Sequence, residues 1–146
     1  MTEDTVLVEI THKNDLLFSA TNRDGHTLGI GPSKTLGGSG LSPSPIDCML
    51  SALGSCAGIK LLMNLSDSGM PPVSLRITIE GRRQSLPPEV FSNLHLTFFL
   101  EGEMDENVVA AAIEKTMTLS CPVAVMIGRA TELTWDFLVG RGSPPS

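Results

Sequence analysis

The sequence predicts an α+β fold in which antiparallel sheets wrap around a long, buried central helix. Segments that alternate apolar and polar residues indicate strands, and one long segment that is apolar on nearly every side indicates a core helix. The elements follow one another as strands, long helix, strands, short helices and a final strand. This order is typical of an α+β fold with antiparallel pairing.

The first part of the chain carries three strand signals and then a connection. Residues 6–10 alternate apolar and polar side chains. Residues 16–21 and 26–30 flank the pair Asp24-Gly25, which favours a hairpin because the turn needs positive φ angles. Residues 31–44 are rich in Gly, Ser and Pro and are predicted to form a loop.

A single long helix is predicted over residues 45–65. Pro45 suits its first turn, where the missing N–H is not needed, and the segment 68–72 with two prolines stops it. Because apolar residues surround this helix, it should be buried in a core rather than lie on a surface. These apolar residues are Ile46, Met49, Leu50, Leu53, Cys56, Ile59, Leu62 and Met63.

Three more strands and two shorter helices are predicted after it. Residues 73–80 and 94–101 each alternate as a strand with one wet face does, and a loop over 82–89 joins them. Residues 133–139 alternate in the same way and predict the last strand.

The two shorter helices precede the last strand. Asp105 is the expected N-cap of the first, which runs to Leu119. The Cys121-Pro122 pair breaks it and starts the second, which ends at Gly128.

The 146 residues are enough for one domain with its own core. We expect this domain over residues 1–139 and a disordered tail over 140–146, where Gly, Ser and Pro dominate. Charged residues make up 18% of the chain, below the roughly 25% usual for soluble domains, whereas 41% are hydrophobic. A large subunit interface would explain this composition and the all-round apolar helix, so we predict a homodimer.

The net charge of −6 argues against nucleic-acid or anionic-membrane binding, because both need a basic surface. The acidic start of the sequence lacks the order of a secretory signal. Lys60 and Asn64 interrupt the apolar run, which argues against a membrane span. Three cysteines, an odd number, fit a reducing compartment better than a disulfide framework. We expect a cytoplasmic protein with no nucleic-acid or membrane partner.

Cys56, in the middle of the long helix, has two candidate roles. A free, buried cysteine often serves only as a small apolar side chain. A reactive thiol is the alternative, because small residues bracket Cys56 and leave room for something to approach it. Lys60, one turn away on the same face, would favour its thiolate. The residues alone leave both roles open.

The other two cysteines have different expected roles. Cys121 precedes a proline at a predicted helix start, where unpaired N–H groups stabilise an anionic sulfur. It is a candidate second sulfur for Cys56. Cys48 lies eight residues before Cys56, about 12 Å away along the helix axis and beyond disulfide reach. Its expected role is structural.

No other motif carries chemistry. The cysteines occur singly and no two histidines have ligand spacing, so no metal site and no cofactor is expected. His12, His26 and His95 are scattered and should be solvated or hydrogen-bonded. The glycine-rich segment 37–40 is a weak phosphate signal.

Two segments around the cysteines resemble signatures of the OsmC/Ohr family. Residues 44–56, Ser-Pro-Ile-Asp-Cys-Met-Leu-Ser-Ala-Leu-Gly-Ser-Cys, resemble its Pro-x-Glu-x-x-x-x-Ala-x-x-x-Cys helix. Cys121-Pro122-Val123 resembles its second signature, Cys-Pro-Val, after an amphipathic helix. The resemblance extends over about residues 18–139. It implies an intertwined homodimer in which sheets wrap two long central helices.

The resemblance also implies an activity, that of a thiol-dependent peroxidase of the oxidative stress response. Such an enzyme reduces organic hydroperoxides and is restored by a dithiol reductant. Carried over to this sequence, Cys56 is the peroxidatic thiol and Cys121 the resolving thiol. The implied partners are a small hydroperoxide, a dithiol and a second copy of the chain.

Two positions depart from the enzymes of that family. Ile46 stands where the hydroperoxide reductases carry a glutamate. Asp47 is a shorter acid about 100° round the helix, and its favoured role is a first-turn residue that suits the helix dipole. The family also steadies the thiolate with an arginine from its N-terminal strands, and Arg23 in the predicted hairpin turn is the candidate.

These departures make the chain resemble the broader OsmC-like branch more than the strict hydroperoxide reductases. A second function therefore stays open: an OsmC-like protein with weak or no activity that binds a small apolar ligand.

Overall fold

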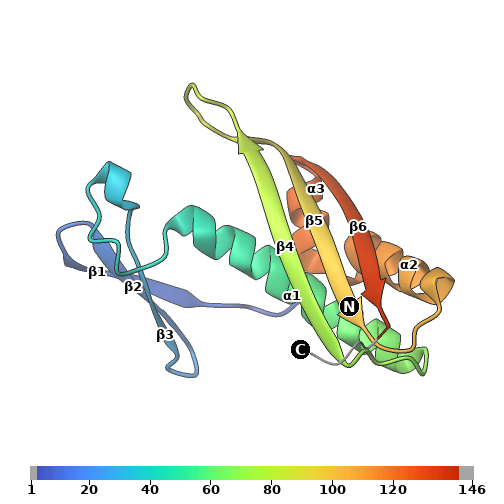
Figure 1. Cartoon of the computed structure of the whole chain (residues 1–146). Coiled ribbons are helices and arrows are strands. Elements are labelled where there is room, and N and C mark those ends of the chain that lie inside the picture. Colours follow the sequence, from blue (N-terminus) through green and yellow to red (C-terminus); the bar gives the residue numbers. More distant parts are fainter. Residues whose placement is uncertain (1–2, 142–146) are drawn as a thin grey trace. The chain divides into compact units, whose positions relative to one another are not determined.

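The computed structural model describes residues 3–141 and divides the chain into two compact units between Leu50 and Ser51. It contains two three-stranded sheets with helices, which confirms the α+β class (Figure 1). The single domain over residues 1–139 stays a prediction. Of the predicted tail, residues 142–146 lie outside the described residues, and Gly140 belongs to the last strand.

The first unit contains an antiparallel sheet in the order β1-β2-β3. Its strands are β1 (Val8–Asn14), β2 (Leu17–Asn22) and β3 (Thr27–Ile30). The predicted hairpin turn between β2 and β3 is confirmed. Gly25 has the positive φ of +88°, and the Asn22 side chain accepts hydrogen bonds from two backbone N–H groups of the turn.

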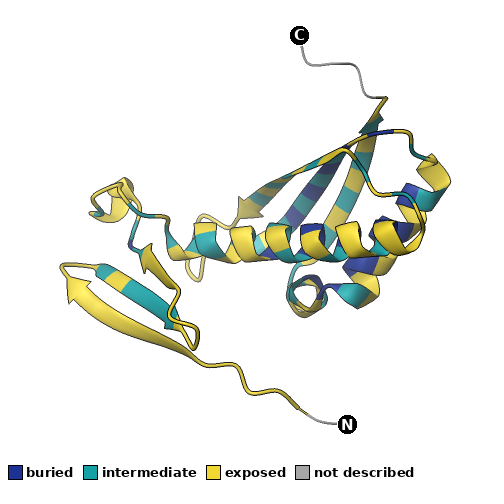
Figure 2. Cartoon of the chain, turned by 90° about the horizontal axis from the view of Figure 1, so that it is seen from below, coloured by how far each residue is buried: buried dark blue, intermediate teal, exposed yellow. Residues whose placement is uncertain are grey.

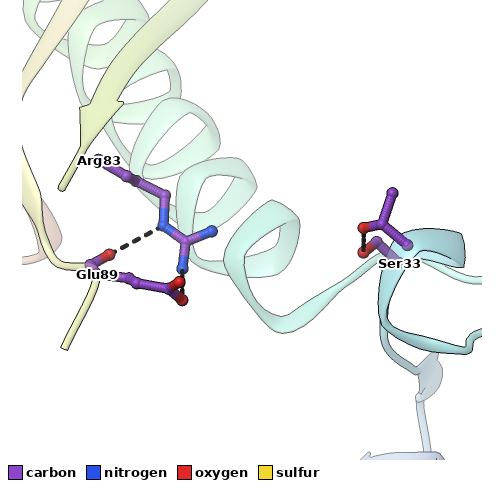
Figure 3. A network of polar contacts seen from close by, with 4 residues as sticks. Ser33, Arg83 and Glu89 are labelled. Carbon is purple, nitrogen blue, oxygen red and sulfur yellow. Dashed lines mark hydrogen bonds and ion pairs between the residues drawn. The ribbon is translucent and has the colours of Figure 1, made fainter. Parts of the chain in front are cut away.

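Strand β1 differs from its predicted bounds of 6–10. It continues to Asn14 because a tight turn at Asp15, with a φ of 45°, pairs it with β2. Aspartate tolerates this left-handed conformation better than most residues. The predicted loop over 31–44 also contains a short 3₁₀ helix, η1 (Lys34–Leu36), beside a hydrogen bond between the Ser33 and Thr35 hydroxyls (Figure 3).

The second unit contains a sheet in the order β4-β5-β6. Its strands are β4 (Ser74–Arg83), β5 (Phe91–Glu101) and β6 (Glu132–Gly140). Strands β4 and β5 are antiparallel as predicted, but β5 and β6 are parallel, so the prediction of antiparallel pairing is wrong for this pair. The reason is the helical connection between them, which returns the chain to the end of the sheet where β5 began.

The helices of this unit cover one face of the sheet (Figure 1). They are α1 (Pro45–Asp67), which begins in the first unit, α2 (Glu106–Lys115) and α3 (Pro122–Gly128). Asp105 caps α2 as predicted, because its carboxylate accepts hydrogen bonds from two N–H groups of the first turn. The predicted helix to Leu119 changes after α2 into a π-helical turn, η2 (Thr116–Ser120).

The core of the second unit lies between the sheet and the helices, where the buried residues gather in Figure 2. Every second residue of β5 points into it. The fully or almost fully buried apolar residues of the sheet are Leu94, Leu96, Phe98 and Leu100. The opposite face of the sheet is polar, with the Arg76 guanidinium 4.0 Å above the Phe99 ring.

Helix α1 is buried on one face only, so its predicted all-round burial is not met within a single chain. Its buried residues are Leu53, Ala57, Gly58, Leu61 and Leu65. On the other side Ile59 is 58% exposed and Met63 is 54% exposed. The three-stranded sheet of this unit covers only one face of the helix, so the predicted burial on all sides is not reached.

Two glycines bring α1 close to the sheet. A Cβ atom on Gly54 would lie 3.1 Å from Ile79 Cδ1, and one on Gly58 would lie 3.2 Å from Ile77 Cδ1. The small residues beside Cys56 therefore admit β4 and do not simply leave open space over the sulfur.

By length and composition α1 is apolar enough to cross a membrane, despite Lys60 and Asn64. Among the described residues a second span would require α2, η2 and α3 to be counted as one bent helix. The core helix of a soluble protein passes the same test, so this result is weak evidence for a span. The cytoplasmic location stays a prediction.

Arg83 contacts Glu89 across the loop between β4 and β5 (Figure 3). Arg83 Nε donates a hydrogen bond to the Glu89 carbonyl at 3.0 Å, and its guanidinium lies 3.6 Å from the Glu89 carboxylate. Both side chains are exposed, so this ion pair orders the loop more than it stabilises the fold.

Candidate active site

The structure brings the Cys56 and Cys121 thiols together, although 65 positions separate them in the sequence. Cys56 projects from the middle of α1 and is half-buried. Cys121 lies between η2 and α3 and is completely buried. Cys56 lies near enough to Cys121 to influence its ionisation, and both thiols are free.

Burial raises the pKa of the Cys121 thiol from 9.0 to about 11. The neighbouring Cys56 adds to this shift, because a hydrogen bond to Cys56 favours the protonated form of Cys121. Backbone N–H groups of Ala124 and Val123 oppose it, and the first lies 3.4 Å from the sulfur. The predicted effect of the helix start is therefore real but weaker than burial, and Cys121 is a neutral thiol near pH 7.

The two cysteines differ in how deeply they are buried. Cys56 is half-buried and is therefore the more accessible of the two residues. Cys121 is shielded and protonated, so it is a poor first nucleophile for such a molecule. It is nevertheless placed to react with Cys56 itself.

A polar network beside the pair was not predicted from the sequence. The Asn64 amide donates hydrogen bonds to Thr116 Oγ1 at 2.9 Å and to Ser120 Oγ at 3.2 Å. Thr116 in turn donates to the Ala112 carbonyl at 2.7 Å. The signal that could have revealed it is an asparagine in a long, mostly apolar helix, since an amide removed from water needs partners.

The remaining thiol and its neighbours lie elsewhere on α1. Cys48 is half-buried in the first turns of the helix, eight residues before Cys56. Lys60 lies one turn after Cys56 and is half-buried, and it forms no ion pair with a carboxylate of residues 3–141. Its support of the Cys56 thiolate stays a prediction.

Asp47 has a structural partner at the start of α1. Its carboxylate accepts a hydrogen bond from the Ser44 N–H at 3.0 Å, and its own N–H donates to Ser44 Oγ at 3.1 Å. This reciprocal pair is a capping box, which is the helix-start role favoured from the sequence. The hydrogen bonds from Ser44 lower the pKa of Asp47 below 3.8. Ile46 beside it is half-buried.

Arg23 is exposed in the β2–β3 turn of the first unit, and its support of Cys56 stays a prediction. The histidines are hydrogen-bonded, as expected: His12 to Asp15, His26 to Asn22, and His95 to Thr134 and Asp136. In the described part of the chain, no three His, Cys, Asp or Glu residues gather as metal ligands would.

Comparisons with known proteins bear on the family and the fold of this chain. The model of a family described as OsmC-like protein matches residues 37–136. Protein YhfA of Escherichia coli strain K12 is 26% identical over 99 residues, which are 67% of this chain and 74% of YhfA.

Solved structures with the same fold have lower sequence identity. The OsmC-like protein from Mycoplasma pneumoniae superimposes with a TM-score of 0.83 at 12% identity, over 96% of this chain and all of the other, 100%. The organic hydroperoxide resistance protein OsmC from Legionella pneumophila superimposes with a TM-score of 0.68 at 15% identity, over 96% of this chain and 99% of the other. At such identities these two matches establish the fold.

The raised pKa of Cys121 predicts a measurable titration. In a Cys48→Ser protein, thiolate absorbance should show one group that ionises near pH 11, and Cys121→Ala should remove it. Because the folded pKa is raised, its contribution to stability is complete below pH 9.0 and is lost as pH rises through about 11. The reduced protein should therefore unfold more easily over that range, and Cys121→Ala should show a smaller loss. Two thiols that both titrate at or below 9.0 would contradict the burial argument.

The capping box predicts a stability effect without an effect on chemistry. Asp47→Ala should unfold at lower denaturant concentration near pH 7, because the Ser44 N–H loses its acceptor. The lowered pKa means that this contribution is present above pH 3.8 and disappears as pH falls through the folded value, so the difference from the unmodified protein should close there. Asp67→Ala, an exposed change at the other end of α1, is the control. If Asp47→Ala loses reaction with hydroperoxide and keeps its stability, Asp47 belongs to the chemistry instead.

Proposed function

The chain belongs to the OsmC-like protein family, and we propose that it is a thiol-dependent peroxidase that reduces organic hydroperoxides. The observation that carries this proposal is the pairing of an accessible thiol, Cys56, with a buried one, Cys121. The Legionella protein of the same fold is an organic hydroperoxide resistance protein, which supports the choice of substrate.

In the first step Cys56 acts as the peroxidatic thiol. Its thiolate sulfur attacks the terminal oxygen of the hydroperoxide, a sulfur–oxygen bond forms and the oxygen–oxygen bond breaks. The alkoxide leaves and takes up a proton as an alcohol. Cys56 loses two electrons and becomes a sulfenic acid.

In the second step Cys121 acts as the resolving thiol. Its sulfur attacks the Cys56 sulfur, the sulfur–oxygen bond breaks, and the hydroxide leaves with the thiol proton as water. Because a thiolate is the attacking species, the raised pKa of Cys121 means that its proton leaves as the sulfur attacks, and this proton completes the water. A dithiol reductant then returns the Cys56–Cys121 disulfide to two thiols in a reducing compartment such as the cytoplasm. The cycle needs no cofactor.

We propose further that the protein works as a homodimer. Ile59, Leu62 and Met63 are exposed on one face of α1, at the spacing of neighbours on a helix. Soluble monomers seldom leave such a contiguous apolar face in water. A second copy of the chain is the natural cover, and an obligate interface of this kind buries more than about 2,000 Å² in total.

Ligand binding without turnover is the second candidate function. A groove of about 410 Å³ lies between α1 and β4, with Leu62, Leu75 and Ile77 among its lining residues. Its apolar lining suits a small apolar molecule. Ile46, in place of the glutamate of the family's hydroperoxide reductases, is the sequence feature that favours this candidate.

The roles of the three cysteines predict three different phenotypes. Cys56→Ser should reduce hydroperoxide consumption to the uncatalysed level, because a hydroxyl is a far weaker nucleophile than a thiolate. Cys121→Ser should spare the first turnover and leave Cys56 as sulfenic or over-oxidised acid. Cys48→Ser, the matched control on the same helix, should change neither. Stopped-flow single turnovers with cumene hydroperoxide and mass spectrometry of the cysteines measure all three.

The opposite pattern would favour ligand binding. Equal oxidation of Cys48 and Cys56, or oxidation of neither, would contradict the peroxidase. Small and similar responses to all three substitutions are expected of a binding protein.

The dimer proposal predicts a mass change on substitution. The unmodified protein should sediment as a dimer at micromolar concentration, whereas Ile59→Lys with Met63→Lys should shift it towards the monomer of 15.5 kDa. Charges in an apolar interface lose hydration without gaining partners. Thr78→Lys, on the exposed polar face of the sheet, is the control. A stable monomer of the unmodified protein would contradict the proposal.

A further inference from the structure

We infer that Asn64 is a positioning residue that fixes Cys121 relative to Cys56. Its role in turnover rests on the proposed function, but the geometry that suggests it does not. The Asn64 amide bonds both ends of η2, at Thr116 Oγ1 and at Ser120 Oγ, with distances of 2.9 and 3.2 Å.

Both ends of η2 control the backbone of Cys121. The Cys121 N–H donates to the Thr116 carbonyl at 2.9 Å, which closes the π-helical turn. Ser120 is the residue that covalently precedes Cys121. Asn64 therefore holds both residues that fix the Cys121 backbone on its N-terminal side, while the Val125 N–H bonds its carbonyl on the other side.

The two hydrogen bonds from Asn64 to Thr116 and Ser120 are called the clamp below. Helix α1 connects this clamp to the Cys56 thiol. Asn64 lies eight residues after Cys56, about 12 Å along the same helix. One rigid element therefore carries the peroxidatic thiol and the group that holds the resolving one. The Thr116 residue is fully buried, and its hydroxyl both accepts from Asn64 and donates to the Ala112 carbonyl within this network.

The clamp matters because the Cys56 sulfenic acid has two fates. Attack by Cys121 gives the disulfide and water, whereas a second hydroperoxide oxidises the sulfenic acid to sulfinic acid and is itself reduced to alcohol. Only the first fate depends on the position of Cys121. Loss of the clamp should slow disulfide formation and leave the first attack on Cys56 unchanged.

The test measures the effective concentration of Cys121 towards Cys56, by equilibration with reduced and oxidised glutathione. All proteins carry Cys48→Ser so that a single thiol pair exchanges. Asn64→Leu should lower the effective concentration by about 10-fold or more, because small displacements of reacting groups have large effects. Ser120→Ala removes one of the two bonds and should lower it less.

Ser68→Ala is the matched control. Its hydroxyl donates to the Asn64 backbone carbonyl at 3.1 Å, so the change removes a hydrogen bond at the same residue without touching η2. We expect no change in effective concentration. A second readout is the ratio of sulfinic acid to disulfide at Cys56 after excess hydroperoxide, which should rise in Ser120→Ala and more in Asn64→Leu.

The outcomes separate this inference from the proposed function. An effective concentration that stays the same in both clamp variants overturns the inference, whatever the activity. If the effective concentration falls in the clamp variants while the protein with an unmodified clamp consumes no hydroperoxide, the positioning role is supported and the peroxidase is overturned. Equal losses in the first turnover and in disulfide formation would show a general role in folding and overturn the inference. If Asn64→Leu does not fold, the comparison of Ser120→Ala with Ser68→Ala decides.

Discussion

The contact between the Cys56 and Cys121 thiols depends on how closely α1 packs into its own unit. Glycines at positions 54 and 58 let the helix approach β4. The same stretch of α1 places Cys56 near Cys121, which lies where η2 ends and α3 begins. Burial between these two helices raises the pKa of Cys121 and keeps its thiol protonated near pH 7. The packing of this helix thus determines how near the two thiols lie and how unequally they are buried.

The same helix explains the unusual composition of the chain. Its inner face completes the core with the sheet, while its outer apolar face stays exposed in a single copy. A sequence with few charges and a helix apolar on every side is what two such surfaces require. The proposed dimer would cover the second face, and the structure of one chain is in this sense incomplete.

Local signals in the sequence were enough to predict most elements and their caps. The turn at Gly25, the Asp105 cap and the start of α3 after Cys121 each depend on residues close in sequence. The parallel pairing of β5 with β6 was missed because strand direction depends on the path of a long connection. The resemblance to a known family supplied the pairing of the two thiols.

Properties that arise from packing could not be predicted in this way. The helix start at Cys121 suggested a stabilised thiolate, but the depth of burial, which no local pattern reports, reversed the sign. The partners of Asn64 lie 52 and 56 positions away, and the π-helical turn that they flank has no sequence signature.

The central claim is that Cys56 and Cys121 form one redox pair, and the most direct measurement is thiol stoichiometry. Fully reduced protein has three free thiols per chain. After one equivalent of cumene hydroperoxide per chain, the account predicts loss of two thiols, one remaining thiol at Cys48, and a disulfide between the Cys56 and Cys121 peptides. Three remaining thiols, or a disulfide that contains Cys48, would contradict it.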